Sequence, residues 1–161
     1  MDGSATSPLP TDVPHFWFWR TYLLVVSVVF ALQGVSWMLF GSFDPFGFYN
    51  SLMARAFWGA ATLTPEAQKT FSFAVVPLGA TTTSYFLLVH VLVKYAFPRR
   101  ERWAYWAVAA ALLLWFSLDT GFSVLHGAWF NVVVVNIPCL AVMGIPLIGM
   151  HRAFVSLAIA R

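Results

Sequence analysis

The sequence predicts an all-α integral membrane protein, a four-helix bundle of membrane spans with a short interfacial helix between spans one and two. Its 161 residues are 60% hydrophobic and 9% charged, with a mean hydropathy of +0.77. Soluble domains carry about 25% charged residues, so this surface requires lipid rather than water. Four apolar runs of 19 to 23 residues contain no Lys or Arg, and a span requires about 20. These runs cover residues 22–40, 71–93, 103–125 and 132–150.

The chain begins with a segment of different composition. Residues 1–14 contain three prolines and no apolar periodicity, which predicts a disordered cytoplasmic tail. Residues 15–20 read His-Phe-Trp-Phe-Trp-Arg, and we interpret them as an interfacial belt, because indole rings favour the headgroup region. The rest, residues 15–161, is expected to form a single domain of four transmembrane helices. Its spans are predicted at about residues 20–41, 66–97, 102–126 and 131–153.

The only long connection lies between spans one and two, and it contains helix signals. Asp44-Pro45-Phe46-Gly47 is a turn sequence, and residues 49–61 have helical composition. We therefore expect a short helix that lies at the membrane surface or dips between the spans. Thr64-Pro65-Glu66 is typical of a helix start, with Thr64 as the N-cap and Pro65 in the first turn.

The second half of the chain predicts a helical hairpin. Residues 127–130 are too few for anything but a tight turn, so spans three and four should be antiparallel neighbours. Pro138 and Pro146 fall inside span four and are expected to kink it.

Basic residues predict the orientation. Seven of the nine precede span one, connect spans two and three or follow span four, which are three places on one side of a four-span chain. The opposite side has Arg55 and Lys69, balanced by Asp44 and Glu66. This positive-inside pattern predicts that both termini lie in the cytoplasm. It also accounts for a pI of about 9.4 without any nucleic-acid partner. The residues are Arg20, Lys94, Arg99, Arg100, Arg102, Arg152 and Arg161.

Asp119 is the most informative single residue, because it is the only acid within the four apolar runs. A carboxylate in hydrocarbon costs about 2.5–3.5 kcal/mol, so such residues usually face a site or a partner. Ser123 and His126 follow at helical spacing on the same face, and Asn131 and Asn136 begin the next span.

Three interpretations of Asp119 are open at this point. It forms a structural ion pair with Arg55, which the short outer helix would bring close; or it binds a ligand or acts in catalysis; or it transfers protons. In the catalytic case Asp119 is the general acid or base, with His126 as its assistant. The wider set of candidate ligand-binding residues is Arg55, Trp58, Gly79, Thr83, Trp115, Asp119, Ser123, Asn131 and Asn136.

Metal and redox chemistry have little support in the sequence. No span contains an HxxxH or ExxH pair, so no metal site is predicted, and no cofactor is identified. The single cysteine, Cys139, cannot form an intrachain disulfide.

A motif across spans three and four resembles that of a known group of proteins. Trp115, Asp119, Ser123, Gly127, Asn131 and Asn136 give the pattern W-x3-D-x3-S-x3-G-x3-N-x4-N. It resembles an uncharacterised family of small bacterial four-span membrane proteins, which also carry Phe-Trp-Gly and Gly-Ala-Thr segments, here residues 57–59 and 79–81. The resemblance covers about residues 50–145. It implies the four-span fold, a location in the inner membrane of a bacterial cell and the choice of candidate site residues, but no reaction.

A weaker resemblance is to emopamil-binding-protein-like membrane proteins. These also enclose acids, amides and Trp around an apolar ligand in a small helical bundle, but their second intramembrane carboxylate has no counterpart here.

The sequence therefore supports three hypotheses for the function. The first is binding of a membrane lipid or other hydrophobic small molecule in a polar-lined pocket around Asp119. The second is a membrane-embedded enzyme of isomerase or hydrolase type that acts on a lipophilic substrate. The third is an accessory subunit, in which Asp119 only pairs with Arg55 and a helix face docks into a larger membrane complex. The candidate protein partners are therefore a second copy of this chain, as a homo-oligomer, or a larger membrane complex.

Overall fold

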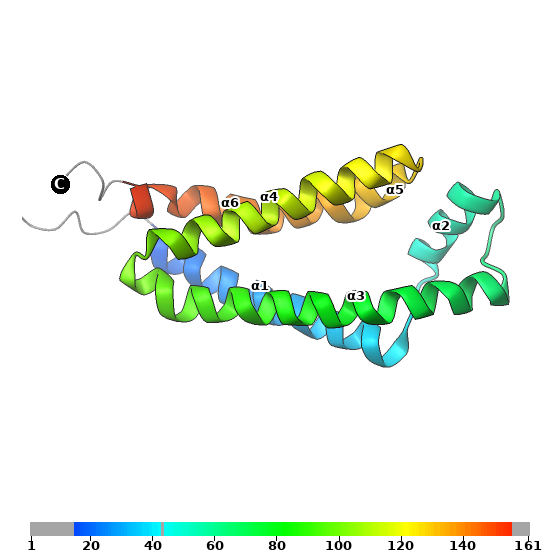
Figure 1. The fold of residues 1–161 in the computed structure, drawn as a ribbon, viewed down its shortest axis with the longest axis horizontal. Coiled ribbons are helices and arrows are strands. Elements are labelled where there is room, and N and C mark those ends of the chain that lie inside the picture. Colours follow the sequence, from blue (N-terminus) through cyan, green and yellow to red (C-terminus); the bar gives the residue numbers. More distant parts are fainter. Residues whose placement is uncertain (1–14, 43, 156–161) are drawn as a thin grey trace, which may run out of the picture.

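The computed structural model describes residues 15–42 and 44–155, and all regular structure in these ranges is helical (Figure 1). The tail predicted over residues 1–14 lies outside the described residues. η1 and η3 are π-helical and η2 is a 3-10 turn. In chain order the elements are α1 (Phe16–Phe40), α2 (Phe48–Trp58), α3 (Pro65–Val91), η1 (Leu92–Ala96), η2 (Phe97–Arg99), α4 (Arg102–Leu125), α5 (Trp129–Asn131), η3 (Val132–Asn136) and α6 (Ile137–Val155).

The prediction of four long apolar helices is confirmed. Four helical stretches of the described chain are long and apolar enough to cross a membrane, and their bounds lie close to those expected. The second and fourth stretches are each composed of consecutive helical elements, α3–η1–η2 and α5–η3–α6. The four stretches are Phe16–Phe40, Pro65–Arg99, Arg102–Leu125 and Trp129–Val155.

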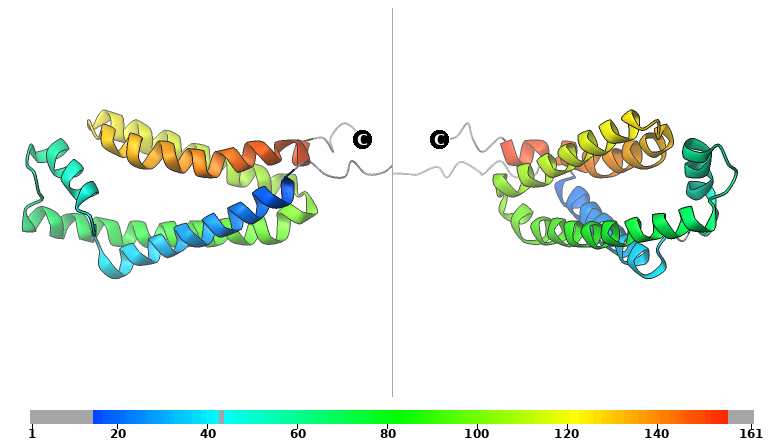
Figure 2. Two further views of the ribbon diagram at one scale, coloured as in Figure 1. Left: turned by 180° about the vertical axis from the view of Figure 1, so that it is seen from behind. Right: turned by 45° about the vertical axis from the view of Figure 1, so that its right-hand side comes forward.

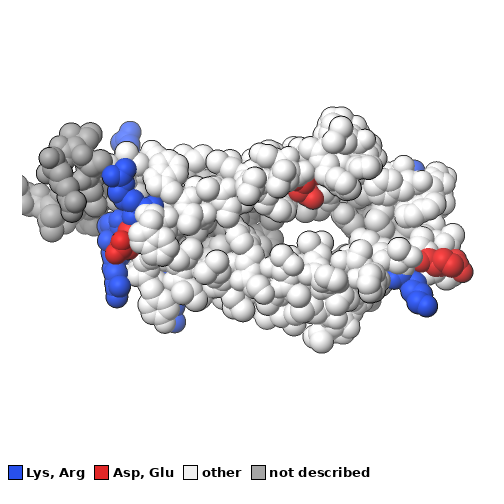
Figure 3. Space-filling model, in the orientation of Figure 1, with Lys and Arg blue, Asp and Glu red and all other residues white. Residues whose placement is uncertain are grey.

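The helices are arranged as two pairs, α1 with α3 and α4 with α6 (Figures 1 and 2). The pairs meet where α1 begins and α6 ends, and they separate toward the end that carries α2. Lys and Arg side chains gather at the end where the pairs meet (Figure 3), which we call the basic end. The opposite end is called the α2 end.

A close glycine contact joins α1 to α3. A Cβ placed on Gly34 would lie 2.5 Å from Thr83 Oγ1 and 2.6 Å from the carbonyl oxygen of Gly79. Thr83 Oγ1 is within hydrogen-bonding distance of two carbonyl oxygens, at 2.9 Å from that of Gly79 and 3.2 Å from that of Ala31 on α1. Small residues of this kind let membrane helices approach closely, so this contact fixes the α1–α3 pair.

Prolines explain both π-helical segments, since η1 ends two residues before Pro98 and η3 two residues before Pro138. A proline ring clashes with the carbonyl four residues earlier, and a π turn accommodates that clash. For Pro98 this carbonyl belongs to Lys94, and Arg20 of α1 donates to it from Nη2 at 2.9 Å. Arg20 Nε also donates to the Val93 carbonyl at 3.1 Å. The kink expected at Pro138 thus takes the form of a π segment.

Aromatic packing holds the pairs together at the basic end. Phe154 of α6 stacks on Tyr105 of α4, with ring centroids 4.7 Å apart, and also contacts Phe97 and Phe16. The Tyr105 hydroxyl donates to the Leu147 carbonyl at 3.2 Å, which adds a direct α4–α6 hydrogen bond. All four rings are almost fully buried, so the core lies mainly toward this end.

The connection to α3 follows the local sequence signals. The helix expected over residues 49–61 is α2, and it stops at Gly59, whose φ of 62° is the left-handed conformation that glycine adopts readily. Thr64 is the N-cap of α3, and its Oγ1 accepts a hydrogen bond from the Ala67 amide at 3.2 Å. The helix expected for span two therefore begins directly after this cap.

The Gly34 contact predicts how α1 and α3 respond to a single methyl group. Gly34→Ala should lower the free energy of unfolding by about 1–3 kcal/mol, because its Cβ meets backbone that cannot move freely. Gly121→Ala is the matched control, since nothing lies within 4 Å of the Cβ position on that helical glycine. Thermal melts in detergent should place Gly34→Ala well below wild type and Gly121→Ala at or slightly above it. Equal melting of the two variants would contradict the close approach of α1 and α3.

Candidate functional site

The separation of the two helix pairs leaves an opening beside the α2 end. Figure 3 shows a gap in the molecular surface there, with acidic atoms on its upper edge. Asp119 is the one acidic residue between Arg102 and Val155, and its partner Asn131 also contacts α2, so the carboxylate lies toward the α2 end of the helix pair α4–α6. Asp119 is half-buried and the neighbouring Ser123 is almost fully buried.

Asn131 connects the polar residues on this edge. Its side-chain nitrogen donates to Asp119 Oδ2 at 3.0 Å and to Ser123 Oγ at 2.9 Å. Its side-chain oxygen accepts a hydrogen bond from the Tyr49 hydroxyl at 3.0 Å. Both amide hydrogens of Asn131 are therefore used on α4, while its oxygen holds α2.

The turn between α4 and α5 brings Asn131 back over Asp119. The helix ends at Leu125, and Gly127 adopts a φ of 70°, a left-handed conformation suited to glycine. The Ala128 amide donates to the Ser123 carbonyl at 2.8 Å, which closes the turn tightly. The expected hairpin over residues 127–130 therefore places an amide on the same polar face as the acid.

The expected ion pair between Asp119 and Arg55 does not form. Arg55 lies in the last turn of α2 and is exposed, and no ion pair joins it to Asp119 within the described ranges. The amide of Asn131 replaces the guanidinium as the partner of the carboxylate. The residue of α2 that reaches the site is Tyr49, six residues earlier.

The position of Tyr49 beside Asn131 and Asp119 changes the pKa of its hydroxyl. Burial, and then the charge of Asp119, raise the pKa of Tyr49 from 10.0 to about 12. A raised pKa in the folded state means that the stability linked to the neutral phenol is complete below pH 10 and is lost as the pH rises through 12. Tyr49 also contacts rings of two other elements, Phe71 at 6.3 Å and Phe130 at 5.3 Å.

Asn136 forms a second polar contact between the fourth and third spans. Its side-chain nitrogen donates to Thr120 Oγ1 at 3.0 Å, and the residue is completely buried. Its side-chain oxygen has no hydrogen-bond partner among the described residues.

The remaining residues predicted for the site are dispersed. Gly79 and Thr83 lie in the α1–α3 contact rather than in the opening. Trp58 is exposed at the end of α2, and Trp115 is half-buried against the core. His126 is exposed, and its ring lies 4.3 Å from that of Phe122. Within the described ranges no hydrogen bond joins it to the Asp119 carboxylate that it was expected to assist.

Sequence reasoning missed Tyr49 and Thr120 as members of these contacts. Thr120 directly follows Asp119, but its pairing with Asn136 depends on the register of α4 against η3. It also missed a Ser–His contact, in which Ser27 Oγ lies 3.0 Å from His90 Nδ1. Ser27 is completely buried between α1 and α3, so this contact is structural.

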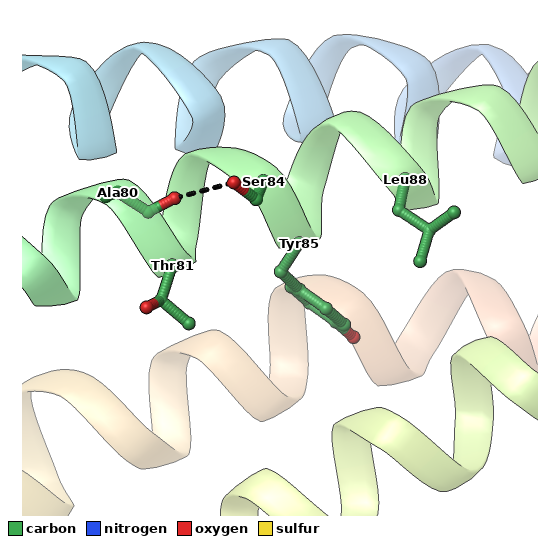
Figure 4. A pocket seen from close by; sticks show the side chains of 5 residues that line it. All are labelled: Ala80, Thr81, Ser84, Tyr85 and Leu88. Carbon is green, nitrogen blue, oxygen red and sulfur yellow. Dashed lines mark hydrogen bonds between the residues drawn. The ribbon is translucent and has the colours of Figure 1, made fainter.

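The other wall of the opening is a groove on α3. Ala80, Thr81, Ser84, Tyr85 and Leu88 line it, and its volume is about 480 Å³. Figure 4 shows the Tyr85 side chain extending from α3 toward the ribbons of the other pair. The walls are therefore mainly apolar, with three hydroxyls along one helix.

Within residues 15–42 and 44–155, no three His, Cys, Asp or Glu side chains lie close enough to hold a metal ion. Comparison of the chain with family models, with curated proteins and with solved structures found no match.

The Asn131 contacts predict a measurable coupling between α2 and α5. Asn131→Ala should lower the free energy of unfolding by about 2 kcal/mol, because it removes three hydrogen bonds. Tyr49→Phe should cost about 0.5–1 kcal/mol alone and nothing further when combined with Asn131→Ala. Chemical denaturation in detergent measures all three.

Tyr22→Phe is the matched control for loss of a phenol hydroxyl, since no hydrogen bond of the Tyr22 hydroxyl occurs in the described structure. It should unfold like wild type. Additive losses in the Tyr49 and Asn131 double variant would show that the two side chains do not interact.

Proposed function

We propose that this protein binds a lipid or another apolar small molecule in the opening between its two helix pairs. The apolar part of the ligand lies along the α3 groove, and its polar end lies near Asp119. The observation that carries the proposal is the opening itself, which has an apolar wall on α3, while the Asp119 carboxylate of α4 lies toward the same α2 end of the molecule. Ligand sites in helical bundles have this composition, mostly apolar with a few polar groups.

The hydrogen-bond arrangement supports a ligand near Asp119. Asn131 donates to Oδ2 only, and within the described ranges Oδ1 has no donor. A half-buried carboxylate without a cation is costly in an apolar environment, so a ligand that donates a hydrogen bond to it would be favoured. Tyr49 and Phe130 give this end of the opening an aromatic border.

Binding is better supported than catalysis or an accessory role. A general acid–base mechanism would require a second group in hydrogen-bond reach of the reacting atom, and His126 lies against Phe122 instead. An accessory role rested on a structural pair of Asp119 with Arg55, which does not form.

The proposal includes a location in the bacterial inner membrane with the basic end on the cytoplasmic side. The exposed cations at that end, which include Lys94, Arg99 and Arg102, support this orientation through the positive-inside rule. Cysteine labelling at residues 5 and 128 from each side of the membrane tests it.

Filling the groove should remove the bound molecule. Ala80 lines the groove, so Ala80→Trp should occupy its volume, whereas Ala110→Trp adds the same ring on an exposed face of α4. Native mass spectrometry of the detergent-extracted protein should show a bound small molecule on wild type and Ala110→Trp, and at least a fivefold lower occupancy on Ala80→Trp.

The same spectra discriminate the alternatives. Equal occupancy on both Trp variants would contradict a ligand in this opening. A fixed protein partner with no bound small molecule would favour an accessory subunit. For Asp119→Asn, loss of turnover with retained ligand would favour an enzyme, whereas a lower occupancy agrees with binding by the carboxylate.

A further inference from the structure

The hydroxyl groups that line the α3 groove differ in how their hydrogens are used. Thr81 Oγ1 donates to the Pro77 carbonyl at 3.0 Å, and Ser84 Oγ donates to the Ala80 carbonyl at 2.9 Å (Figure 4). A hydroxyl carries one hydrogen, so both groups can offer a ligand only their lone pairs. Neither can donate to a bound molecule without breaking a bond to its own helix.

Tyr85 is the exception. Its ring lines the groove and points toward the facing helix pair, and its hydroxyl oxygen is buried without a hydrogen-bond partner among the described residues. A phenol hydroxyl in an apolar setting usually has a partner, because an unmade bond there is unfavourable. Of the three hydroxyls beside the groove, that of Tyr85 is therefore the one whose hydrogen the described residues leave unused, and the ring must turn for this hydroxyl to reach a bound molecule.

From this difference we propose that the molecule bound in the groove carries a carbonyl oxygen that accepts a hydrogen bond from the Tyr85 hydroxyl. The chemical class is a lipophilic ketone or quinone that also carries a hydroxyl group at its polar end. The inference rests on the proposed function, since it identifies a polar group of the same ligand. It adds a second point of recognition, because Asp119 requires a donor on the ligand and Tyr85 an acceptor.

The depth of Tyr85 favours a ketone or quinone over the ester of a bilayer lipid. Along the helix axis it lies about 14 Å from Lys94 and about 24 Å from Lys69, the charged residues that flank this part of α3. This is near the middle of a hydrocarbon layer about 30 Å thick, whereas glycerol esters lie at its edges. A carbonyl oxygen near the middle of the hydrocarbon layer therefore belongs to the apolar part of the ligand and not to a glycerol ester.

The test compares two probes of equal length, tridecan-7-one and tridecane, which differ by one carbonyl oxygen. Binding of each to the full chain in detergent is measured by displacement of a fluorescent fatty-chain probe. The ratio of ketone to alkane affinity is compared between variants, so that differences in partitioning cancel. Wild type should have a ratio about fivefold higher than Tyr85→Phe, as expected for one neutral hydrogen bond.

Matched variants distinguish hydrogen-bond donation by Tyr85 from the general polarity of the groove. Thr81→Val and Ser84→Ala remove hydroxyls from the same groove but should keep the wild-type ratio, because their hydrogens already serve the helix. Tyr85→Phe should melt at or above the wild-type temperature, since it removes an unpartnered polar atom. Its lower ratio would then not come from misfolding.

A further pair of probes, ester-linked and ether-linked phosphatidylcholine, distinguishes the source of the carbonyl. A Tyr85-dependent preference for the ketone alone supports the proposal. A Tyr85-dependent preference for the ester lipid alone overturns the assignment to a ketone or quinone. Equal ratios in wild type and Tyr85→Phe overturn the donor role while leaving the proposed function intact. No binding of any probe, together with no bound molecule in native mass spectra, contradicts both.

Discussion

The amide of Asn131 is the interaction on which the α2 end of this structure depends. The two helix pairs separate at this end, and one side chain donates two hydrogen bonds to α4 and accepts one from α2. It satisfies one oxygen of Asp119, the only acid within the four apolar runs of the sequence, and at the same time accepts a hydrogen bond from Tyr49 of α2. In an apolar environment an amide with both hydrogens and its oxygen engaged is a stable link, and the partners would be left unsatisfied without it.

The opening exists because the two helix pairs pack closely against each other only at the basic end. Gly34 and Gly79 fix α1 against α3, and the aromatic residues around Phe154 fix the two pairs to each other at the basic end. Toward the α2 end, hydroxyl side chains of α3 face the gap and bond to their own helix rather than to α4 or α6. The pairs therefore have a strong junction at one end and a single polar link at the other.

Hydropathy and local signals predicted much of the fold, because spans, the Thr64 cap and the turn before α5 depend on nearby residues only. The grouping of Asp119 with Ser123 and Asn131 also followed, since helical spacing and a short turn leave few alternatives. The Arg55 partner was wrong because charge complementarity alone does not say which face of α2 turns inward. Gly79 was assigned to the pocket because the sequence does not specify which helices pair closely.

The central claim is that two helix pairs, joined at the basic end, are held at a fixed separation by Asn131. Spin labels on Phe73 of α3 and Leu125 of α4, both highly exposed, would report the distance across the opening in lipid nanodiscs. The account predicts one narrow distance distribution in wild type and a longer, broader one in Asn131→Ala, while labels on Tyr95 and Trp103 at the basic end stay unchanged. An identical Phe73–Leu125 distribution in wild type and Asn131→Ala would contradict it.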